Sequence, residues 1–405
     1  MWTPARTPGS VPGPMPSSPR VPALDLRAQY AAIRDDVRAA VDRVFENQAF
    51  ILGEEVEALE RELAAFCEAR FAITCGSGSD ALLLALMALD VGPGDEVICP
   101  AFTFFATAGA VSRLGARPVF VDIDPATYNI DPAAVRVAAA RCTRLRAILP
   151  VHLYGAAADM DALIAIAEES GAALVEDAAQ AIGARDASGR RIGGRSRVAC
   201  FSFYPTKNLG GAGEGGFLST DDADLAERLR RLRVHGSSRR YVHEELGMNS
   251  RLDALQAVVL RVKLRRLDAW NDARHRHAVA YDQAFARGGA QPNTVPLDAG
   301  GLPLRTPASV APPAVHVHHQ YVIRVAAALR DPLREHLAAH GIGSDVYYPL
   351  GLHQQQCFAA LGHREGDLPE TERAAREVVA LPIYPELETA QREHVVASVL
   401  DFLAR

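Results

Sequence analysis

One lysine stands between an aromatic run and several glycines in the stretch FSFYPTKNLGGAGEGG, residues 201–216. The chain contains 43 lysine and arginine residues, yet only two of them, Lys207 and Lys263, are lysines. Arginine serves as well wherever a position needs only a solvated positive charge, so a lysine here calls for a chemical reason. An amine can lose its proton and attack a carbonyl carbon, whereas a guanidinium stays charged. We therefore predict that Lys207 is a catalytic amine rather than a chance surface lysine.

Two other loops carry groups that suit an anion and a cationic ring. In CGSGSDALLLAL, residues 75–86, glycines precede Ser79 and Asp80 at the start of a helix. Free backbone N–H groups and the positive end of the helix dipole would face an anion there, although an ordinary capped helix has the same pattern. Asp177 ends the apolar segment 172–177, where an unpaired carboxylate is costly and no lysine or arginine is adjacent. A protonated ring nitrogen would satisfy this carboxylate.

These groups together match the chemistry of pyridoxal phosphate. Ser202, five residues before Lys207, could add a hydroxyl donor for the same anion. The anion cradle would take the phosphate, the carboxylate the pyridine nitrogen, and the amine the aldehyde. Phe104 follows the apolar segment 97–100 and could stack on the ring, although a core phenylalanine fits the spacing equally well.

The elements that position these residues alternate between short apolar runs and helical stretches. The expected strands are 71–75, 96–100, 118–124, 146–153, 172–177, 198–203 and 215–220, and the helices between them include 80–89, 103–114 and 159–170. Such alternation predicts an α/β domain with a mainly parallel sheet covered by helices. Ligands of these sheets lie beyond the carboxyl ends of the strands. The loops after residues 75, 100, 153, 177 and 203 should therefore meet.

We divide the chain into a tail, two domains and a connecting helix. Residues 1–20 are rich in Pro, Ser and Gly and are predicted to be disordered. Residues 21–250 form the large domain, and 251–287 form one long helix, on whose solvated face we place Lys263. Residues 288–405 form a smaller α/β domain. Its expected strands are 319–325 and 344–349, and its expected helices lie near 332–340, 370–380 and 388–403.

Composition excludes several classes of function. The net charge of −6 argues against a general nucleic-acid binder. The six cysteines are scattered without a C-x-x-C pair, which fits reduced thiols in a cytoplasmic protein. No apolar run reaches transmembrane length, so we expect no membrane partner. The histidines in HVHH, residues 316–319, could bind a metal, but histidines entering a strand are more often surface or packing residues, and we expect no metal site.

The chain resembles the DegT/DnrJ/EryC1 family of sugar aminotransferases, which are fold-type I pyridoxal-phosphate enzymes acting on nucleotide-linked keto-sugars. The blocks that carry the resemblance are FILGEEVEALE, GSGSDALLLAL, PAFTFFATAGA, PVFVDIDPATYNID, PVHLYG, VEDAAQAIGA, CFSFYPTKNLGGAGEGG, GMNSRLDALQA and VYYPLGLHQQQ. The last block leans toward members that act at the C3 position of the sugar. The resemblance thus implies amino transfer from L-glutamate to a keto-sugar linked to UDP or dTDP.

The same resemblance assigns roles to individual residues. It implies that Lys207 forms a Schiff base with the cofactor, that Asp177 keeps the ring nitrogen protonated, and that Gln180 contacts the ring hydroxyl. The other implied cofactor-binding residues are Gly78, Ser79, Phe104, Ser202 and Asn249. Asn249 would reach the phosphate of the neighbouring subunit, which makes a homodimer the expected active unit. The implied substrate-binding residues are His152, Arg251, Tyr347, Tyr348 and His353.

Departures from the family pattern and two alternative functions remain. Gly351 and Cys357 stand where prolines are usual, and Glu214 replaces the aspartate of many members, so the shape of the substrate loop is open. A pyridoxal-phosphate sugar dehydratase is one alternative, but that branch carries histidine in place of Lys207. A non-catalytic regulator that binds the cofactor or a sugar nucleotide is the other, and it would need no reactive amine.

Overall fold

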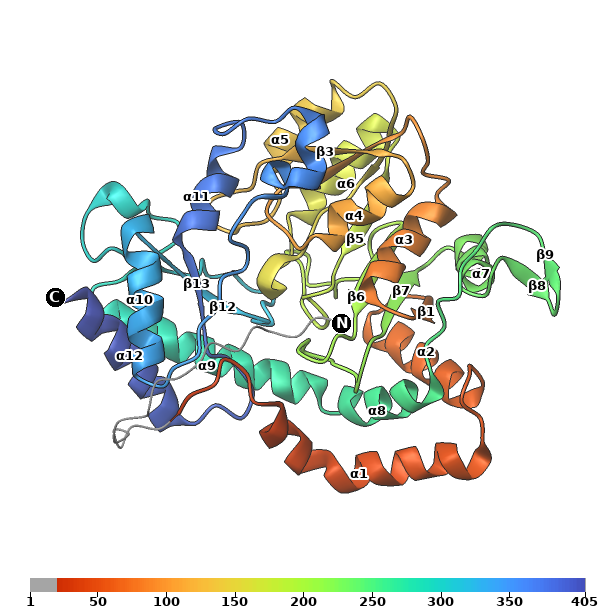
Figure 1. The fold of residues 1–405 in the computed structure, drawn as a ribbon, viewed down its shortest axis with the longest axis horizontal. Helices are drawn as coiled ribbons and strands as arrows, with labels where there is room; N and C mark the ends of the chain where they lie inside the picture. Colours follow the sequence, from red (N-terminus) through yellow and green to blue (C-terminus); the bar gives the residue numbers. More distant parts are fainter. Residues whose placement is uncertain (1–19, 405) are drawn as a thin grey trace, which may run out of the picture.

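The computed structural model describes residues 20–404, so the predicted tail lies outside the described residues except for Arg20. Figure 1 shows a large body built on one sheet and a smaller unit beside it. The strands are β1 (Phe71–Cys75), β2 (Glu96–Pro100), β3 (Arg117–Val121), β4 (Leu145–Ile148), β5 (Ala173–Asp177), β6 (Val198–Ser202), β7 (Gly216–Thr220), β8 (Ser237–Arg239), β9 (Val242–His243), β10 (Gln291–Pro292), β11 (Leu304–Thr306), β12 (Tyr321–Val325) and β13 (Val378–Leu381).

The helices alternate with these strands through most of the chain. They are α1 (Leu26–Asn47), α2 (Glu54–Phe66), α3 (Gly78–Ala88), α4 (Ala106–Arg113), α5 (Pro132–Ala139), α6 (Met160–Ser170), α7 (Ala223–Leu232), α8 (Ala254–Leu264), α9 (Leu267–Arg287), α10 (Ala327–Ala339), α11 (Pro369–Glu377) and α12 (Thr389–Leu403). Short 3-10 turns lie at Leu153–Gly155, Leu297–Ala299, Leu352–Gln354 and Gln356–Leu361. Within residues 20–404, every helix is too short or too polar to span a bilayer.

The large sheet has seven strands in the order β1-β7-β6-β5-β4-β2-β3. Strand β7 runs antiparallel to both of its neighbours, and the remaining neighbouring pairs are parallel. The expected α/β class with a mainly parallel sheet is therefore confirmed. Gly216 at the start of β7 pairs with Cys75 and with Ser202, so the carboxyl ends of β1 and β6 flank one point.

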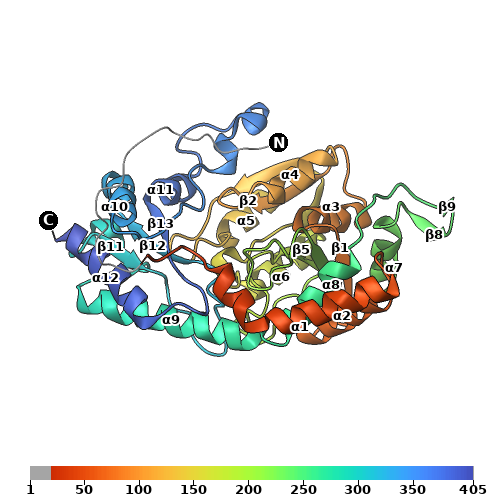
Figure 2. The same cartoon turned by 60° about the horizontal axis from the view of Figure 1, so that its bottom comes forward.

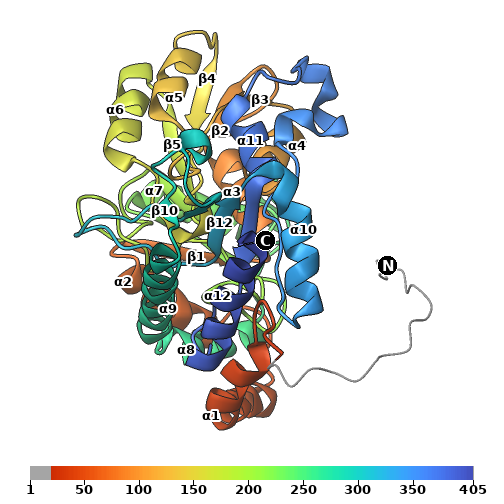
Figure 3. The ribbon, with the colours of Figure 1, turned by 90° about the vertical axis from the view of Figure 1, so that its left-hand side faces the viewer.

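Both faces of this sheet are buried, because side chains alternate between the faces along each strand. Ile98 packs into the apolar cluster shared with α2, α5, α6 and α8. Its neighbours Val97 and Cys99 pack into the cluster shared with α3, α4 and α7. Figure 3 shows α5 and α6 on one side of the sheet and α4 on the other. Covered faces leave the strand ends as the place for a ligand.

The smaller unit has a four-stranded sheet in the order β10-β11-β12-β13. Tyr281 and Phe285 of α9 pack into its core together with residues of β12, β13, α10 and α12. The predicted helix near 370–380 ends earlier, because Val378–Leu381 pairs with β12 as a buried strand. The predicted strand 344–349 is wrong: only an isolated bridge between Asp345 and Ala380 forms there.

The prediction of a single helix over residues 251–287 is also wrong, because the segment forms two helices, α8 and α9. The chain turns at Arg266, whose N–H donates to the Lys263 carbonyl at 2.9 Å, and the next helix begins at Leu267. The sequence has no Gly or Pro at this turn, so no local signal marked it. Figure 2 shows α1, α2 and α8 lying together along one edge of the molecule.

Lys263 does not lie on a solvated face, which corrects the sequence-based placement. Its side chain is only partly exposed, and Nζ donates to the carbonyl oxygen of Gly210 at 2.6 Å. Burial lowers the pKa of the Lys263 amine to about 8. Both lysines of the chain thus belong to the same region, because Gly210 follows Lys207 by three residues.

Candidate active site

A cavity of about 540 Å³ opens where the large sheet meets the smaller unit. The loops after β1, β2, β5 and β6 form one side of it. Residues from the turn before β12, from the segment after α10 and from the end of β13 form the other. The cavity brings together these sequence-predicted residues: Gly78, Ser79, Phe104, Asp177, Gln180, Ser202, Lys207, Tyr347 and Tyr348. Four of the five loops expected to meet, those after residues 75, 100, 177 and 203, therefore do meet, while the segment after β4 contributes only Val151.

The cradle at the start of α3 is built by close backbone approach. Ser77 caps the helix, since its hydroxyl accepts the N–H of Asp80 at 3.0 Å. A Cβ at Gly78 would lie 2.6 Å from the Cβ of Ser202, so only glycine lets the two loops touch. A Cβ at Gly216 would likewise lie 2.6 Å from the Ser77 carbonyl oxygen. The first N–H groups of a helix have no acceptor within it, so they are available to an anion beside the Ser79 and Ser202 hydroxyls.

Asp177 ends β5 on the floor of the cavity and is 5% exposed. Its Oδ2 accepts the hydroxyl of Thr107 at 2.8 Å, and Oδ1 accepts the N–H of Ala179 at 3.2 Å. Burial raises the pKa of Asp177, and these two hydrogen bonds oppose the rise. A carboxylate that is desolvated yet held in place is suited to a cationic N–H.

Lys207 enters the cavity from a tight turn after β6. Its backbone N–H donates to the Tyr204 carbonyl at 2.8 Å. Desolvation lowers the pKa of the Lys207 amine to about 8, while the negative charge of Asp177 acts in the opposite direction. A larger fraction of the amine is therefore neutral near physiological pH than in an exposed lysine, and the neutral form is the one that acts as a nucleophile or proton acceptor.

The remaining wall is aromatic and amide-lined. Gln180 Oε1 accepts the Tyr154 N–H at 2.6 Å, and its Nε2 donates to the Tyr348 hydroxyl at 3.1 Å. This fixes the orientation of the Gln180 amide. Phe104 is 57% exposed, and its ring centroid lies 6.3 Å from that of Tyr348. Phe104 thus offers a free ring face at the mouth of the cavity.

Four of the predicted residues lie outside the cavity wall. His152 is fully buried: Ala158 N–H donates to Nδ1 at 3.0 Å, and Nε2 lies 2.8 Å from Glu176 Oε2. His353 is also buried, with Nε2 at 3.1 Å from Glu372 Oε1. In this structure neither histidine presents a ring nitrogen to the cavity.

Asn249 and Arg251 flank Ser250, which contacts the first loop. Between them, Ser250 accepts the Gly76 N–H at 3.0 Å and donates to Asp80 Oδ2 at 2.8 Å. Asn249 itself is exposed. The segment therefore holds the first loop through hydrogen bonds of Ser250 within one subunit.

Sequence reasoning missed four residues that shape the site. Thr107 and Ser250 act through hydrogen bonds that only the fold reveals. Arg274 and His319 line the cavity. Arg274 is buried against backbone carbonyls, including that of Ile383 at 2.9 Å. His319 belongs to the HVHH run, whose histidines are buried. Within residues 20–404, no group of three His, Cys, Asp or Glu is arranged to hold a metal.

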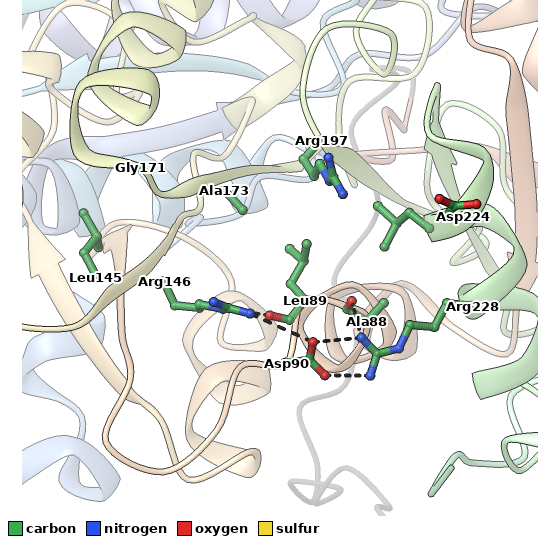
Figure 4. A pocket seen from close by; sticks show the side chains of 11 residues that line it. Ala88, Leu89, Asp90, Leu145, Arg146, Gly171, Ala173, Arg197, Asp224 and Arg228 are labelled. Atoms are coloured by element: carbon green, nitrogen blue, oxygen red, sulfur yellow. Dashed lines mark hydrogen bonds and ion pairs between the residues drawn. The ribbon is translucent and has the colours of Figure 1, made fainter. Parts of the chain in front are cut away.

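A second hollow, of about 380 Å³, lies at the opposite edge of the sheet, where β4 and β5 begin. Figure 4 shows Arg146 and Arg228 pointing toward Asp90. The Arg228 guanidinium contacts both Asp90 oxygens at 2.6 and 2.9 Å, and Arg197 pairs with Asp222 at 2.7 Å. These charges already pair with one another, so the hollow is a surface ion network and the chemistry belongs to the first cavity.

Comparisons with known proteins agree with this geometry. Residues 31–400 match the sequence model of the DegT/DnrJ/EryC1/StrS aminotransferase family. The chain is 48% identical to a Geobacillus stearothermophilus protein named "Pleiotropic regulatory protein", over 94% of this chain and 98% of that one. It is 46% identical to the dTDP-3-amino-3,4,6-trideoxy-alpha-D-glucose transaminase of Streptomyces venezuelae, over 96% and 97%. It is 43% identical to the UDP-N-acetyl-3-dehydro-alpha-D-glucosamine 3-aminotransferase of Acidithiobacillus ferrooxidans, over 96% and 99%.

Solved structures show the same fold. The crystal structure of S. venezuelae DesV in complex with a ketimine intermediate matches with a TM-score of 0.89 at 46% identity, over 96% of this chain and 100% of that one. NtdA of Bacillus subtilis with bound cofactor PMP matches with a TM-score of 0.83 at 30% identity, over 92% and 82%. The expected family resemblance and the expected aminotransferase fold are both confirmed.

The cavity fits pyridoxal phosphate, the cofactor of the matched family. The glycine-lined cradle at Gly78 suits a phosphate, because a side chain there would fill the space. The desolvated carboxylate of Asp177 suits a protonated pyridine nitrogen. The Lys207 amine, which lines the same cavity, suits the aldehyde.

Proposed function

The chain belongs to the DegT/DnrJ/EryC1/StrS aminotransferase family, and on that premise we propose that it transfers an amino group from L-glutamate to C3 of a keto-sugar linked to UDP or dTDP. One observation carries the proposal: the Lys207 amine, with its lowered pKa, shares a cavity with Asp177 and the cradle at Gly78. When bound, pyridoxal phosphate supplies an electron sink for the substrate carbon that loses a proton.

Each residue of the cavity has a role that follows from its position. Asp177 would hold the ring N–H, and Thr107 and the Ala179 N–H would keep its carboxylate aimed and ionised. Lys207 would anchor the aldehyde covalently in the resting enzyme and, once displaced, would carry a proton to and from the reacting carbon. Gly78, Ser79 and Ser202 would bind the phosphate, while Gln180 would contact the ring hydroxyl and Phe104 the ring face.

The acceptor is assigned from the relatives and from the cavity mouth. Two relatives are named as enzymes of 3-amino sugars, one on dTDP and one on UDP. Tyr347 and Tyr348 line the cavity on the side of the smaller unit, where the sugar would enter. His152, Arg251 and His353 remain predictions as substrate-binding residues. In this structure the two histidines could act only through their buried glutamate partners.

A homodimer with Asn249 acting across the interface completes the proposal. Asn249 is exposed, and Tyr241 and Leu246 nearby are 81% and 94% exposed. Such large exposed apolar side chains are typical of a surface that a partner covers. Figure 1 shows the hairpin β8–β9 standing away from the body of the chain. We also propose a cytoplasmic location, which the six free thiols support.

Mixed dimers would test the role of Asn249. Lys207→Ala and Asn249→Ala subunits, each inactive alone, would recover about a quarter of the wild-type activity when mixed at random, because one site in each hybrid would be intact. A site whose Asn249 comes from its own subunit would show no recovery.

The central experiment is absorption spectroscopy of the purified protein with pyridoxal phosphate. The visible band of cofactor attached to Lys207 should give way to a shorter-wavelength band when L-glutamate is added. Lys207→Ala should show neither the attached band nor the change, and Lys207→Arg should behave in the same way because a guanidinium stays protonated. Keto-sugars on UDP and dTDP would then be screened as acceptors.

A regulatory role is the second candidate, because one relative bears a regulatory name. The same spectra separate the two functions. A protein that binds the cofactor but shows no band change with any amino donor would refute the transaminase proposal and favour the regulator. Cofactor attached to a residue other than Lys207 would refute the assignment of the amine.

A further inference from the structure

Lys263 is the second of only two lysines in a chain that otherwise uses arginine. It lies in the last turn of α8, and its Nζ donates to the Gly210 carbonyl at 2.6 Å. Its neighbour Arg265 is exposed, as expected for a solvated cation at the end of a helix. The lysine therefore has a specific acceptor in the loop that carries Lys207.

That loop is compact and leaves little room for adjustment. A Cβ at Gly210 would lie 2.3 Å from the Pro205 carbonyl oxygen, so the chain doubles back on itself between these two residues. Lys207 lies between them, at the top of the turn. The N–H of Gly211 donates to the Phe203 carbonyl at 2.7 Å and closes the turn at its base. A shift of the Gly210 carbonyl would therefore also move the backbone of Lys207, which lies in the same tight turn.

Helices α8 and α9 hold the same loop at two further points. Gln256 Oε1 of α8 accepts the Ala212 N–H at 2.8 Å. Asn208, the residue after Lys207, donates from Nδ2 to Asn271 Oδ1 of α9 at 2.7 Å. Lys263 completes these attachments at the residue between them, Gly210.

There is also a physical reason why position 263 has a lysine rather than an arginine. The ammonium is a compact donor that meets one carbonyl at the end of a mostly buried stem. A guanidinium carries five N–H groups in a rigid plane, and burying it would leave several of them without acceptors. Arginine therefore does not substitute for lysine at this position, in contrast to the rest of the chain.

We propose that Lys263 is a positioning residue for Lys207: its hydrogen bond to Gly210 fixes the turn that aims the Lys207 amine into the cavity. The proposal rests on the proposed role of Lys207 as the amine that binds the cofactor. Without this bond the turn loosens and admits water around Lys207. Desolvation then lowers the pKa of Lys207 less, so a smaller fraction of its amine is neutral.

The test compares Lys263→Met, which removes the donor, with Lys263→Gln, which keeps an uncharged N–H donor. Arg265→Met is the matched control, because it removes one positive charge from the same helix end. The readout is the rate at which added pyridoxal phosphate becomes attached, followed by its visible band across pH 6–10. In this step the Lys207 nitrogen bonds to the aldehyde carbon, and the aldehyde oxygen leaves as water.

We expect attachment at pH 7.5 to slow about tenfold in Lys263→Met, as for loss of a hydrogen bond to a charged group. Its pH profile should move to higher pH, Lys263→Gln should fall between Met and wild type, and Arg265→Met should match wild type. Equal rates and profiles in Lys263→Met and Arg265→Met would overturn the proposal. So would a slower rate with an unmoved profile, because that would indicate general destabilisation.

Borohydride trapping followed by peptide mass spectrometry separates this failure from failure of the proposed function. Label on Lys207 of the wild-type protein establishes the amine on which the inference rests. Label on Lys207 together with unaltered kinetics in Lys263→Met would reject the positioning role alone. Label elsewhere, or none, would reject both.

Discussion

The hydroxyl of Thr107 is the group whose removal tests the electrostatics of the site most directly. Thr107 is fully buried, and it donates to Asp177 Oδ2 at 2.8 Å. Thr107→Val keeps the branched shape and deletes only this donor. Asp177 retains the Ala179 N–H on its other oxygen. The substitution therefore isolates one of the two hydrogen bonds that oppose the effect of burial on the pKa of Asp177.

The sign and size of the effect follow from the contact. A buried hydrogen bond to a charged group contributes about 1.5–3 kcal/mol, and its loss penalises the ionised carboxylate. The pKa of Asp177, already raised by burial, must rise further. Because about 1.4 kcal/mol corresponds to one pH unit, the acid limb of the first half-reaction should move up by about one pH unit or more. Activity at pH 6 should fall more than activity at pH 8.

The same shift acts on stability. A carboxyl group whose pKa is higher in the folded than in the unfolded state favours folding when protonated, and this contribution is lost as pH rises through the folded value. Thr107→Val raises that value, so its melting temperature should fall further below wild type at pH 8 than at pH 5. Melting curves of the protein without added cofactor measure this difference.

Thr103→Val is the matched control, because Thr103 contacts the Thr107 hydroxyl at 2.9 Å and lies one step farther from Asp177. It should move the acid limb less than Thr107→Val. An acid limb that stays in place in Thr107→Val, with the fold intact, would refute the reasoning. So would a limb that moves equally in both variants, because the effect would then not pass through Asp177.

Two further substitutions test the cradle. Gly78→Ala places a methyl 2.6 Å from the Ser202 Cβ, so cofactor affinity should fall about tenfold or more in a fluorescence titration; unchanged affinity would mean that the loops can separate. Ser250→Ala removes the acceptor of the Gly76 N–H and the donor to Asp80, so affinity should fall by about threefold to tenfold and the melting temperature should drop; a loss of affinity without any loss of stability would mean that Ser250 itself faces the ligand.

The strands that position the site could be predicted because each is short, apolar and followed by a polar or glycine-rich loop. The carboxyl end of β5 at Asp177 was placed correctly, because a charge that directly ends an apolar run marks the edge of a sheet. The loops after β1 and β6 were expected to meet because both follow strands of one mainly parallel sheet, but the contact of Gly78 with Ser202 also depends on β7, which lies antiparallel between those strands. The order of apolar runs and polar loops in the sequence is thus enough to predict which end of the sheet forms the cavity.

The partners of those residues could not be predicted, because they come from distant parts of the chain. Thr107 precedes Asp177 by 70 residues, and Ser250 follows Asp80 by 170. The segment 344–349 alternates like a strand, but it has only one bridge and its tyrosines turn into the cavity. Periodicity reports which residues are buried, whereas hydrogen-bond partners depend on how separate elements dock.

The two lysines show where reasoning from residue type holds and where it needs the fold. The rarity of lysine in this chain singled out Lys207, because an amine can lose its proton whereas a guanidinium cannot. The same argument applied to Lys263, but its arginine neighbours and helical setting suggested a solvated face. In the structure the Lys263 ammonium donates to a single carbonyl in a desolvated position. A compact donor fits there, whereas the planar guanidinium of an arginine would leave several N–H groups without acceptors. The rarity of lysine therefore marked both positions, for two properties that a guanidinium lacks: Lys207 requires an amine that can lose its proton, and Lys263 requires a compact donor.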